Sequence, residues 1–245
     1  MHVIFNADDF GLTPGINLGI IAANQVGVVR STTLMVGMTA EKQAIELAKN
    51  TPSLHVGIHL RFTTGVPLTS ASSLTDQNGS FFSCHQFRQK QHFSEQQITD
   101  EITAQIEYFL TTGIQLSHID SHHHAHVHPQ ILPIVKDFAR YYNVPLRESG
   151  YLNSTKKQAK YYFYSGFYGE NATINTILNI INQHRNDTDI LEIMCHPAYI
   201  DQLLLDSSSY ALPRAKELEI LTDEKFIMQL QEQDIILSDY SVLLD

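Results

Sequence analysis

The sequence predicts an α/β protein built as a single-domain distorted (β/α) barrel of parallel strands, similar to a TIM barrel. Short apolar segments rich in β-branched residues alternate with segments of helical periodicity, an order typical of parallel sheets. The chain has 245 residues, an ordinary length for an α/β barrel, and 43% of them are hydrophobic, which is sufficient for a core. Polar residues follow several predicted strands, and in a barrel the C-terminal ends of the strands share the face that carries the active site.

The N-terminal half begins with a predicted strand over residues 3–6. Thr13 and Pro14 then predict a helix start, because threonine caps a first turn and proline fits the first helical position. Ser94 and Gln97 form a capping-box pattern ahead of another helix. Further elements expected in this half are strands at 31–36 and 54–60 and a helix at about 40–49.

The C-terminal half continues the alternation. It predicts strands at 116–120, 144–148, 190–194 and 235–237 and helices from 129, at 174–183 and at 222–233. The count is seven or eight strands, some of them weak, so we expect an incomplete or distorted barrel. No linker is visible, and residues 1–245 are predicted to form one domain.

Two stretches break this alternation. Residues 62–93 show no clear periodicity, and loops this long in a compact domain are usually lids or binding loops. Residues 161–169 hold six aromatic side chains. Most of these are expected to fill the core, whereas Tyr168 is a candidate for a sugar-binding wall, because a tyrosine ring has an apolar face and a polar tip. The segment could also contribute to a homodimer interface.

Composition excludes several classes of protein. The net charge is −10 with histidine counted neutral, and no basic tract occurs, so no nucleic-acid partner is expected. The two cysteines, Cys84 and Cys195, form no CxxC pattern, which excludes a disulfide scaffold or thiolate zinc site and fits a reducing compartment. No segment approaches the ~20 apolar residues of a membrane helix, and no secretory signal is apparent. We therefore expect a cytoplasmic protein with no membrane partner.

The segment 118–128 places six of the thirteen histidines within eleven residues. If it starts as a strand, His118, Asp120 and His122 point to one side, where they would supply metal ligands and their hydrogen-bonded supports. The alternative is a solvated tract that binds metal adventitiously. Apolar residues within the run and periodic segments on both sides favour a built site.

Other strand ends offer matching groups. Asp8 and Asp9 follow the first strand, His59 ends another, and His196 follows the strand at 190–194. A divalent metal held by Asp9, His59 and His122 would be a two-histidine, one-carboxylate site with open positions for water and substrate. Such a metal polarises a carbonyl and lowers the pKa of bound water. Asp8 would then accept the proton of the water, and His196 could protonate a leaving amine.

Three further polar residues surround this predicted centre. Asp120 and His124 are expected to orient the metal ligands rather than to bind metal. Arg147 follows a predicted strand and has two equally supported interpretations. It binds an anionic part of a substrate, or it forms a salt bridge with the excess carboxylates of the site.

Four motifs together resemble a known family. They are, in order, residues 6–11 (NADDFG), 57–59 (GIH), 118–124 (HIDSHHH) and 194–198 (MCHPA). This order and spacing resemble the YdjC-like carbohydrate deacetylases, which include enzymes that act on chitooligosaccharides. The resemblance implies a barrel-like fold and hydrolysis of an N-acetyl group from an amino sugar or short chitooligosaccharide. It also implies one divalent metal ion, magnesium or zinc, on His59, His122 and an aspartate of the Asp8–Asp9 pair. By analogy with metal-dependent polysaccharide deacetylases, Asp8 is assigned as base and Asp9 as ligand.

Two other interpretations remain open. The first is another metal-dependent barrel hydrolase, a phosphoesterase or an amidohydrolase, although such sites usually place a His-x-His pair where this chain has Asp8 and Asp9. The second is a metal- or sugar-binding regulator without catalysis, which would need neither Asp8 nor His196. The identity, length and phosphorylation of the sugar are left open by the sequence.

Overall fold

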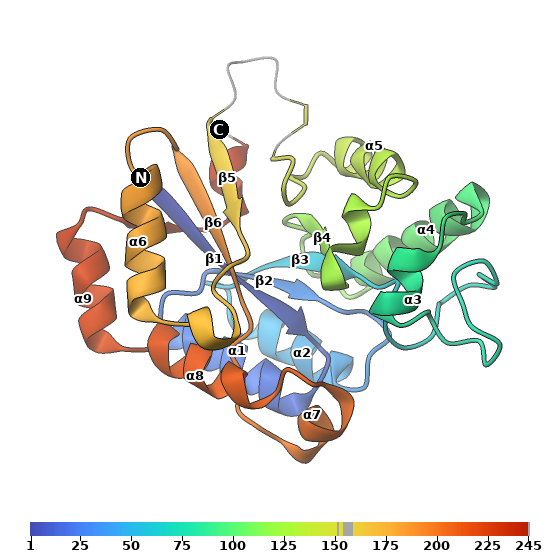
Figure 1. Ribbon diagram of the computed structural model, residues 1–245, viewed down its shortest axis with the longest axis horizontal. Helices are drawn as coiled ribbons and strands as arrows, with labels where there is room; N and C mark the ends of the chain where they lie inside the picture. The colour runs from blue at the N-terminus through green and yellow to red at the C-terminus, as the bar shows by residue number, and fades with distance from the viewer. Residues whose placement is uncertain (151, 154–158, 245) are drawn as a thin grey trace.

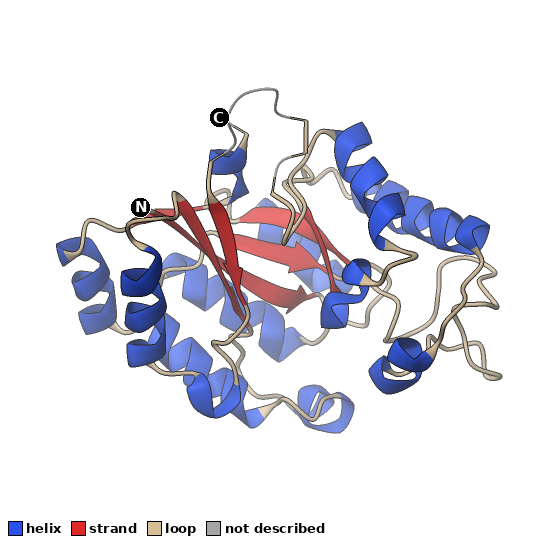
Figure 2. Ribbon diagram, turned by 45° about the horizontal axis from the view of Figure 1, so that its top comes forward, coloured by secondary structure: helices blue, strands red, loops and turns tan. Residues whose placement is uncertain are grey.

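The centre of the molecule is a curled sheet of seven parallel strands (Figures 1 and 2). The computed structural model describes residues 1–150, 152–153 and 159–244. Six strands follow the order β4-β3-β2-β1-β6-β5, and β7 pairs with the start of β1. Their bounds are β1 His2–Phe10, β2 Ser31–Leu34, β3 His55–Leu60, β4 Ile119–Ser121, β5 Tyr161–Tyr164, β6 Ile190–Cys195 and β7 Ile236–Ser238. The predicted distorted barrel of parallel strands is confirmed.

Helices surround the outer side of this sheet (Figure 2). The longer ones are α1 Pro14–Gln25, α2 Glu41–Lys49, α4 Glu95–Thr111, α5 Leu132–Tyr142, α6 Ile174–His184, α8 Leu212–Leu221 and α9 Glu224–Glu232. Short helices are α3 Cys84–Gln89 and α7 Gln202–Ser207, and 3-10 turns are η1 His122–Val127, η2 Gly169–Asn171 and η3 Tyr240–Leu243. No helix in the described ranges is long and apolar enough to cross a membrane.

The strands alternate between an apolar outer face and a polar inner face. In β1, Val3, Phe5 and Ala7 belong to the main apolar core, whereas Asn6 and Asp8 are joined by a hydrogen bond within a buried polar network. Successive side chains of a strand point to opposite faces, so one face can pack on the helices while the other carries polar groups. The chemistry of this protein is therefore concentrated inside the curl of the sheet.

The expected strand at 144–148 is wrong. Leu146 makes only an isolated parallel bridge to Ile119, and the chain then turns back so that Leu146 also bridges Gly150. Glu148 has a φ of 65°, in the left-handed region, which an extended strand cannot accommodate. Among the described residues no strand joins β4 to β5, so the barrel formed by the described strands is incomplete.

The helix signals differ in how well they predicted the structure. Thr13 caps α1 as expected, accepting a hydrogen bond from the Ile16 N–H. Ser94 caps α4, but the Gln97 side chain accepts from the Ser73 N–H instead of completing a capping box. A complete capping box occurs at Ser83, which starts α3 inside the segment expected to lack periodicity. That the whole of residues 1–245 forms one domain stays a prediction.

Candidate active site

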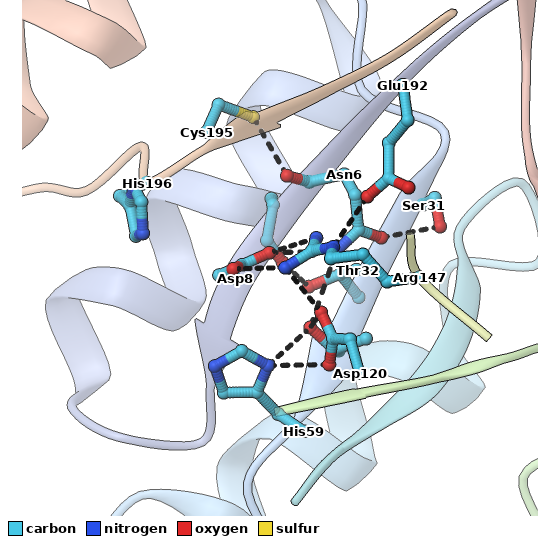
Figure 3. A network of polar contacts seen from close by, with 12 residues as sticks. Asn6, Asp8, Ser31, Thr32, His59, Asp120, Arg147, Glu192, Cys195 and His196 are labelled. Atoms are coloured by element: carbon cyan, nitrogen blue, oxygen red, sulfur yellow. Dashed lines mark hydrogen bonds and ion pairs between the residues drawn. The ribbon is translucent and has the colours of Figure 1, made fainter. Parts of the chain in front are cut away.

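His59, at the end of β3, is fixed inside the sheet by neighbouring polar groups (Figure 3). Its Nδ1 lies 2.6 Å from Asp120 Oδ1 on β4 and 3.1 Å from the Thr33 hydroxyl on β2. Burial alone would lower the pKa of His59, but the Asp120 carboxylate outweighs it and raises that pKa to about 10. With Nδ1 held by Asp120, the other ring nitrogen faces Asp9, as in a metal-binding histidine oriented by a carboxylate.

Asp9 lies one residue before the end of β1, in a backbone conformation unusual for a non-glycine residue. Its φ is 71°, and the register between β1 and β2 is interrupted between Ala7 and Phe10. Asp9 Oδ1 lies 2.9 Å from His122 Nδ1 and 3.4 Å from His59 Nε2, while Oδ2 accepts a 2.6 Å hydrogen bond from Arg214. Burial opposes ionisation, yet Arg214 and His122 hold the pKa of Asp9 well below its usual range.

The donor atoms of Asp9, His59 and His122 fit a divalent cation. One carboxylate oxygen and two imidazole nitrogens lie within 4.8 Å of one another. Asp8, His59 and Asp120 form a second group with the same spacing, but the Arg147 guanidinium bonds both of its carboxylates, so a cation there would meet a positive charge. Among the described residues, the Asp9 group is therefore the better candidate for a metal.

Arg147 lies at the centre of the buried polar network (Figure 3). Its guanidinium donates 2.7 Å hydrogen bonds to both carboxylate oxygens of Asp8 and to Glu192, and it lies 2.8 Å from Asp120. Burial would raise the pKa of Asp8, but Arg147 holds it well below its usual range. Arg147 is fully buried, so of its two interpretations the geometry matches the salt bridge and not contact with a substrate.

His196 follows β6 and faces two tyrosines. Its ring makes edge contacts with Tyr168 and Tyr210, each with centroids 5.7 Å apart, and these two tyrosine rings stack at 3.8 Å. Its backbone N–H donates a hydrogen bond to the Glu217 carboxylate. Burial and the nearby Arg214 charge lower the pKa of His196 to about 4, so its imidazole is neutral at pH 7.

A cavity of about 500 Å³ opens onto these groups. Its walls include Asp8, Asp9, His59, His122, His196 and Tyr168. A hollow of about 620 Å³ lies elsewhere, around Leu54, Leu116 and Leu244, away from the Asp9 group. The smaller cavity is the candidate active site, because it is there that titratable groups with shifted pKa values converge on a polar pocket.

A family model for YdjC-like proteins matches residues 2–232 of this chain. The chain belongs to the YdjC-like family. A carbohydrate deacetylase from Vibrio cholerae serotype O1 (strain M66-2) is 47% identical over 244 residues, which cover 100% of this chain and 97% of the relative. A carbohydrate deacetylase from Brevibacillus brevis is 41% identical over 253 residues, covering 99% and 100%.

Solved structures share the fold of this YdjC-like chain. One from Enterococcus faecalis V583, described provisionally as a cellobiose-phosphate cleavage protein, has a TM-score of 0.90 and 33% identity, covering 99% of this chain and 98% of the other. A family 4 carbohydrate esterase from Streptomyces lividans, in complex with acetate, has a TM-score of 0.52 and 10% identity, covering 98% and 91%. At that identity the second likeness concerns the fold alone.

The histidine cluster of this YdjC-like chain divides among different surroundings. His122 reaches Asp9, whereas His118 stacks on Tyr240 at 3.5 Å and His124 lies 3.7 Å from Glu148. The division follows from η1, where His123 and His124 have left-handed φ values of 54° and 55° and turn the chain away from the strand direction. Asp120 thus contacts a candidate ligand directly, whereas the described contacts of His124 are with Glu148 and Phe163.

Three polar residues at the site were missed from the sequence. Arg214 and Glu217 lie one turn apart on α8, and Tyr210 precedes that helix. Each contacts a predicted site residue: Arg214 contacts Asp9, Glu217 contacts His196, and Tyr210 contacts Tyr168. The available signal was the Arg-x-x-Glu spacing, which places both charges on one face of a helix.

Proposed function

We propose that this protein is a carbohydrate deacetylase that removes the N-acetyl group from an acetylated amino sugar or short chitooligosaccharide, with or without a phosphate. One observation carries the proposal. The Asp9–His59–His122 group shares a single cavity with Asp8 and His196, so candidate metal ligands and proton-transfer groups face the same space. The names of the full-length relatives support the same reaction.

The proposed cofactor is one divalent metal ion, magnesium or zinc, held by Asp9, His59 and His122. When bound, it would polarise the acetyl carbonyl and increase the acidity of a water molecule. Asp120 holds His59 Nδ1 and leaves Nε2 free, and Arg214 occupies only one oxygen of Asp9. His59 Nε2 and Asp9 Oδ1 therefore face each other, 3.4 Å apart, and each residue presents one donor atom to the same point of the site.

Asp8 and His196 are proposed to move the protons. The oxygen of water attacks the acetyl carbon, and Asp8 accepts the proton that the water loses. The carbon–nitrogen bond then breaks, His196 donates a proton to the amine nitrogen of the sugar, and acetate leaves. Arg147 keeps Asp8 ionised and ready to accept a proton, although the low pKa of Asp8 limits its strength as a base.

The cavity suits a small carbohydrate. Its volume of about 500 Å³ lies within the range of small-molecule sites. Tyr168 is 44% exposed and stacks on Tyr210, so one wall is an aromatic surface on which we propose that a sugar ring packs. Both cysteines are free, which supports a place for the enzyme in the reducing cytoplasm.

The test is release of acetate from N-acetylglucosamine oligomers and their 6-phosphates, using metal-stripped protein and the same protein restored with magnesium or zinc. We expect acetate only from the restored protein. Release of inorganic phosphate without acetate would support the phosphoesterase alternative. A folded, metal-loaded protein that is inactive on every acetylated sugar would refute the proposal.

A further inference from the structure

His196 has an unmet requirement in this structure. It is neutral at pH 7, so it must gain a proton before it can donate one, and its surroundings disfavour the positive charge. Its Nδ1 is buried and has no hydrogen-bond partner. A buried nitrogen without a partner is costly, and an imidazolium would be costlier still without a nearby negative charge.

Glu217 is placed to meet this requirement. Its Oε2 accepts the hydrogen bond from the His196 backbone N–H and lies 3.9 Å from His196 Nδ1. Its Oε1 accepts a hydrogen bond from the Tyr210 hydroxyl, and that hydroxyl accepts a 2.7 Å bond from the Gly169 N–H. Glu217 is fully buried, so these contacts are not exchanged for water.

The other charged groups around His196 either are paired with an arginine or disfavour a positive charge on its imidazole. Asp8 is paired with Arg147, and Asp9 with Arg214. The groups that act on the His196 charge from the neighbouring elements are Asp8 and Asp9 of β1, His59 of β3 and Arg214 of α8, with Tyr168 and Tyr210 against the ring. The hydrogen bonds to Glu217 come from neutral donors, so its negative charge is not cancelled by an ion pair with an arginine.

We propose that Glu217 is a positioning residue that fixes His196 and supplies the negative charge that lets its imidazole carry a proton to the leaving amine. When the imidazole is protonated, Nδ1–H donates to Glu217 while the proton on Nε2 is transferred to the amine nitrogen. The bond to Tyr210 links this carboxylate to the aromatic wall, so the proton donor and the proposed sugar surface are held by one residue. This inference rests on the proposed deacetylase function.

Burial raises the pKa of Glu217 to about 7. Because the first proton taken up by Glu217 and His196 can reside on either group, the two titrate as a coupled pair, and the alkaline limb of the pH profile reports that pair. A purely structural role, in which Glu217 only anchors the backbone of residue 196, would give no shift in the limb that reports His196.

The experiment compares Glu217→Gln with wild type and with Glu219→Gln, a matched control on an exposed position of the same helix. Glutamine keeps the shape and loses the charge. Without the charge, the protonated His196 is less stable, so we expect kcat to fall ~10–100-fold with KM within ~3-fold of wild type, and the alkaline limb of the kcat profile to move to lower pH. The Glu219→Gln control should match wild type in kcat, in KM and in the pH of the alkaline limb.

Thermal unfolding and bound-metal content establish that each variant is folded and loaded. A Glu217→Gln protein that is folded and loaded, with kcat within ~3-fold of wild type and an unmoved limb, overturns the inference. If the glutamine variant does not fold, Glu217→Asp is used instead, because aspartate keeps the charge. We then expect a lower kcat and an alkaline limb at the wild-type pH. An alkaline limb that is shifted in Glu217→Asp overturns the inference. A wild-type protein that releases no acetate refutes the proposed function itself, and the inference with it.

Discussion

Replacing Arg147 by methionine would leave three carboxylates inside the sheet without their shared cation. Arg147 bonds Asp8, Asp120 and Glu192, and the side chains of Arg147, Asp120 and Glu192 are fully buried. Methionine is a flexible, unbranched and uncharged side chain that fills the space of the arginine stem, although not that of the guanidinium. The substitution therefore tests the electrostatic contribution of Arg147 more than its size.

The expected loss follows from the number of charges left behind. Breaking a buried ion pair by removing one partner costs about 3–5 kcal/mol. In the variant the pKa values of the three carboxyl groups rise. Each carboxyl group that becomes protonated in the folded state therefore increases the free energy of unfolding as the pH falls. One pKa unit corresponds to about 1.4 kcal/mol. Between pH 7 and 5, the loss in free energy of unfolding relative to wild type should therefore shrink by about 1.4 kcal/mol per pH unit for each proton that the folded variant has bound.

Wild type behaves in the opposite sense for Asp8. The pKa of Asp8 is lowered, so its contribution to stability is present above the unfolded pKa and is lost only as the pH falls through the folded one. Beyond the effect of burial, Arg147 lowers the pKa of His118, His124 and His126, so only the contributions of the histidines remote from Arg147 cancel in the difference. Urea unfolding followed by circular dichroism at pH 5, 6 and 7 measures that difference.

Arg140→Met is the matched control, because Arg140 pairs with Asp137 on an exposed turn of α5. Its cost should be within about 0.5 kcal/mol of zero at every pH. An Arg147→Met protein that loses less than about 1 kcal/mol at pH 7, or whose deficit does not change with pH, would refute the reasoning, since three buried carboxylates cannot all remain ionised without Arg147 at so small a cost.

Three further predictions concern the candidate ligands, the base and the helix packing. His59→Ala should abolish metal binding, and Asp120→Asn should weaken it by about 10–100-fold in a calorimetric titration, because Asp120 orients the ring; unchanged affinity in both would exclude the Asp9 group as the metal site. Asp8→Asn should keep the metal and lose turnover, whereas near-wild-type acetate release would show that Asp8 is not the base. Gly19→Ala should lower the free energy of unfolding by about 1–3 kcal/mol, because a Cβ there would lie 2.5 Å from Ala198 Cα; an unchanged urea midpoint would show that α1 can shift without cost.

The sequence predicted the part of the site that depends on strand ends. Asp8, Asp9 and His59 lie near the C-terminal ends of β1 and β3, and His196 follows β6, and the ends of parallel strands meet at one edge of the sheet. Their convergence on one cavity could therefore be expected from the order of strands and helices. The allocation of individual roles remains a proposal.

The parts contributed by α8 could not be predicted in the same way. Arg214 and Glu217 are buried on that helix beside Leu218 and Leu221, so polar and apolar residues are buried together. Helical periodicity identifies a buried face by its apolar residues, and this mixture weakens the signal. The left-handed conformations of His123 and His124 are equally invisible, because they depend on tertiary contacts such as the bond between Thr63 and His123.

The alternation of the strands separates two sources of stability in this molecule. Outward residues such as Phe5 and Ile193 bury apolar surface against the helices, and inward residues such as Asp8 and Glu192 are held by ion pairs. Apolar burial determines the heat-capacity change of unfolding. The ion pairs determine how the free energy of unfolding depends on pH. Substitution of an outward residue should thus change the heat-capacity change of unfolding, and substitution of the next, inward residue should change the pH dependence of stability. Inward positions can therefore change the chemistry of the site while the heat-capacity change that comes from the core is retained.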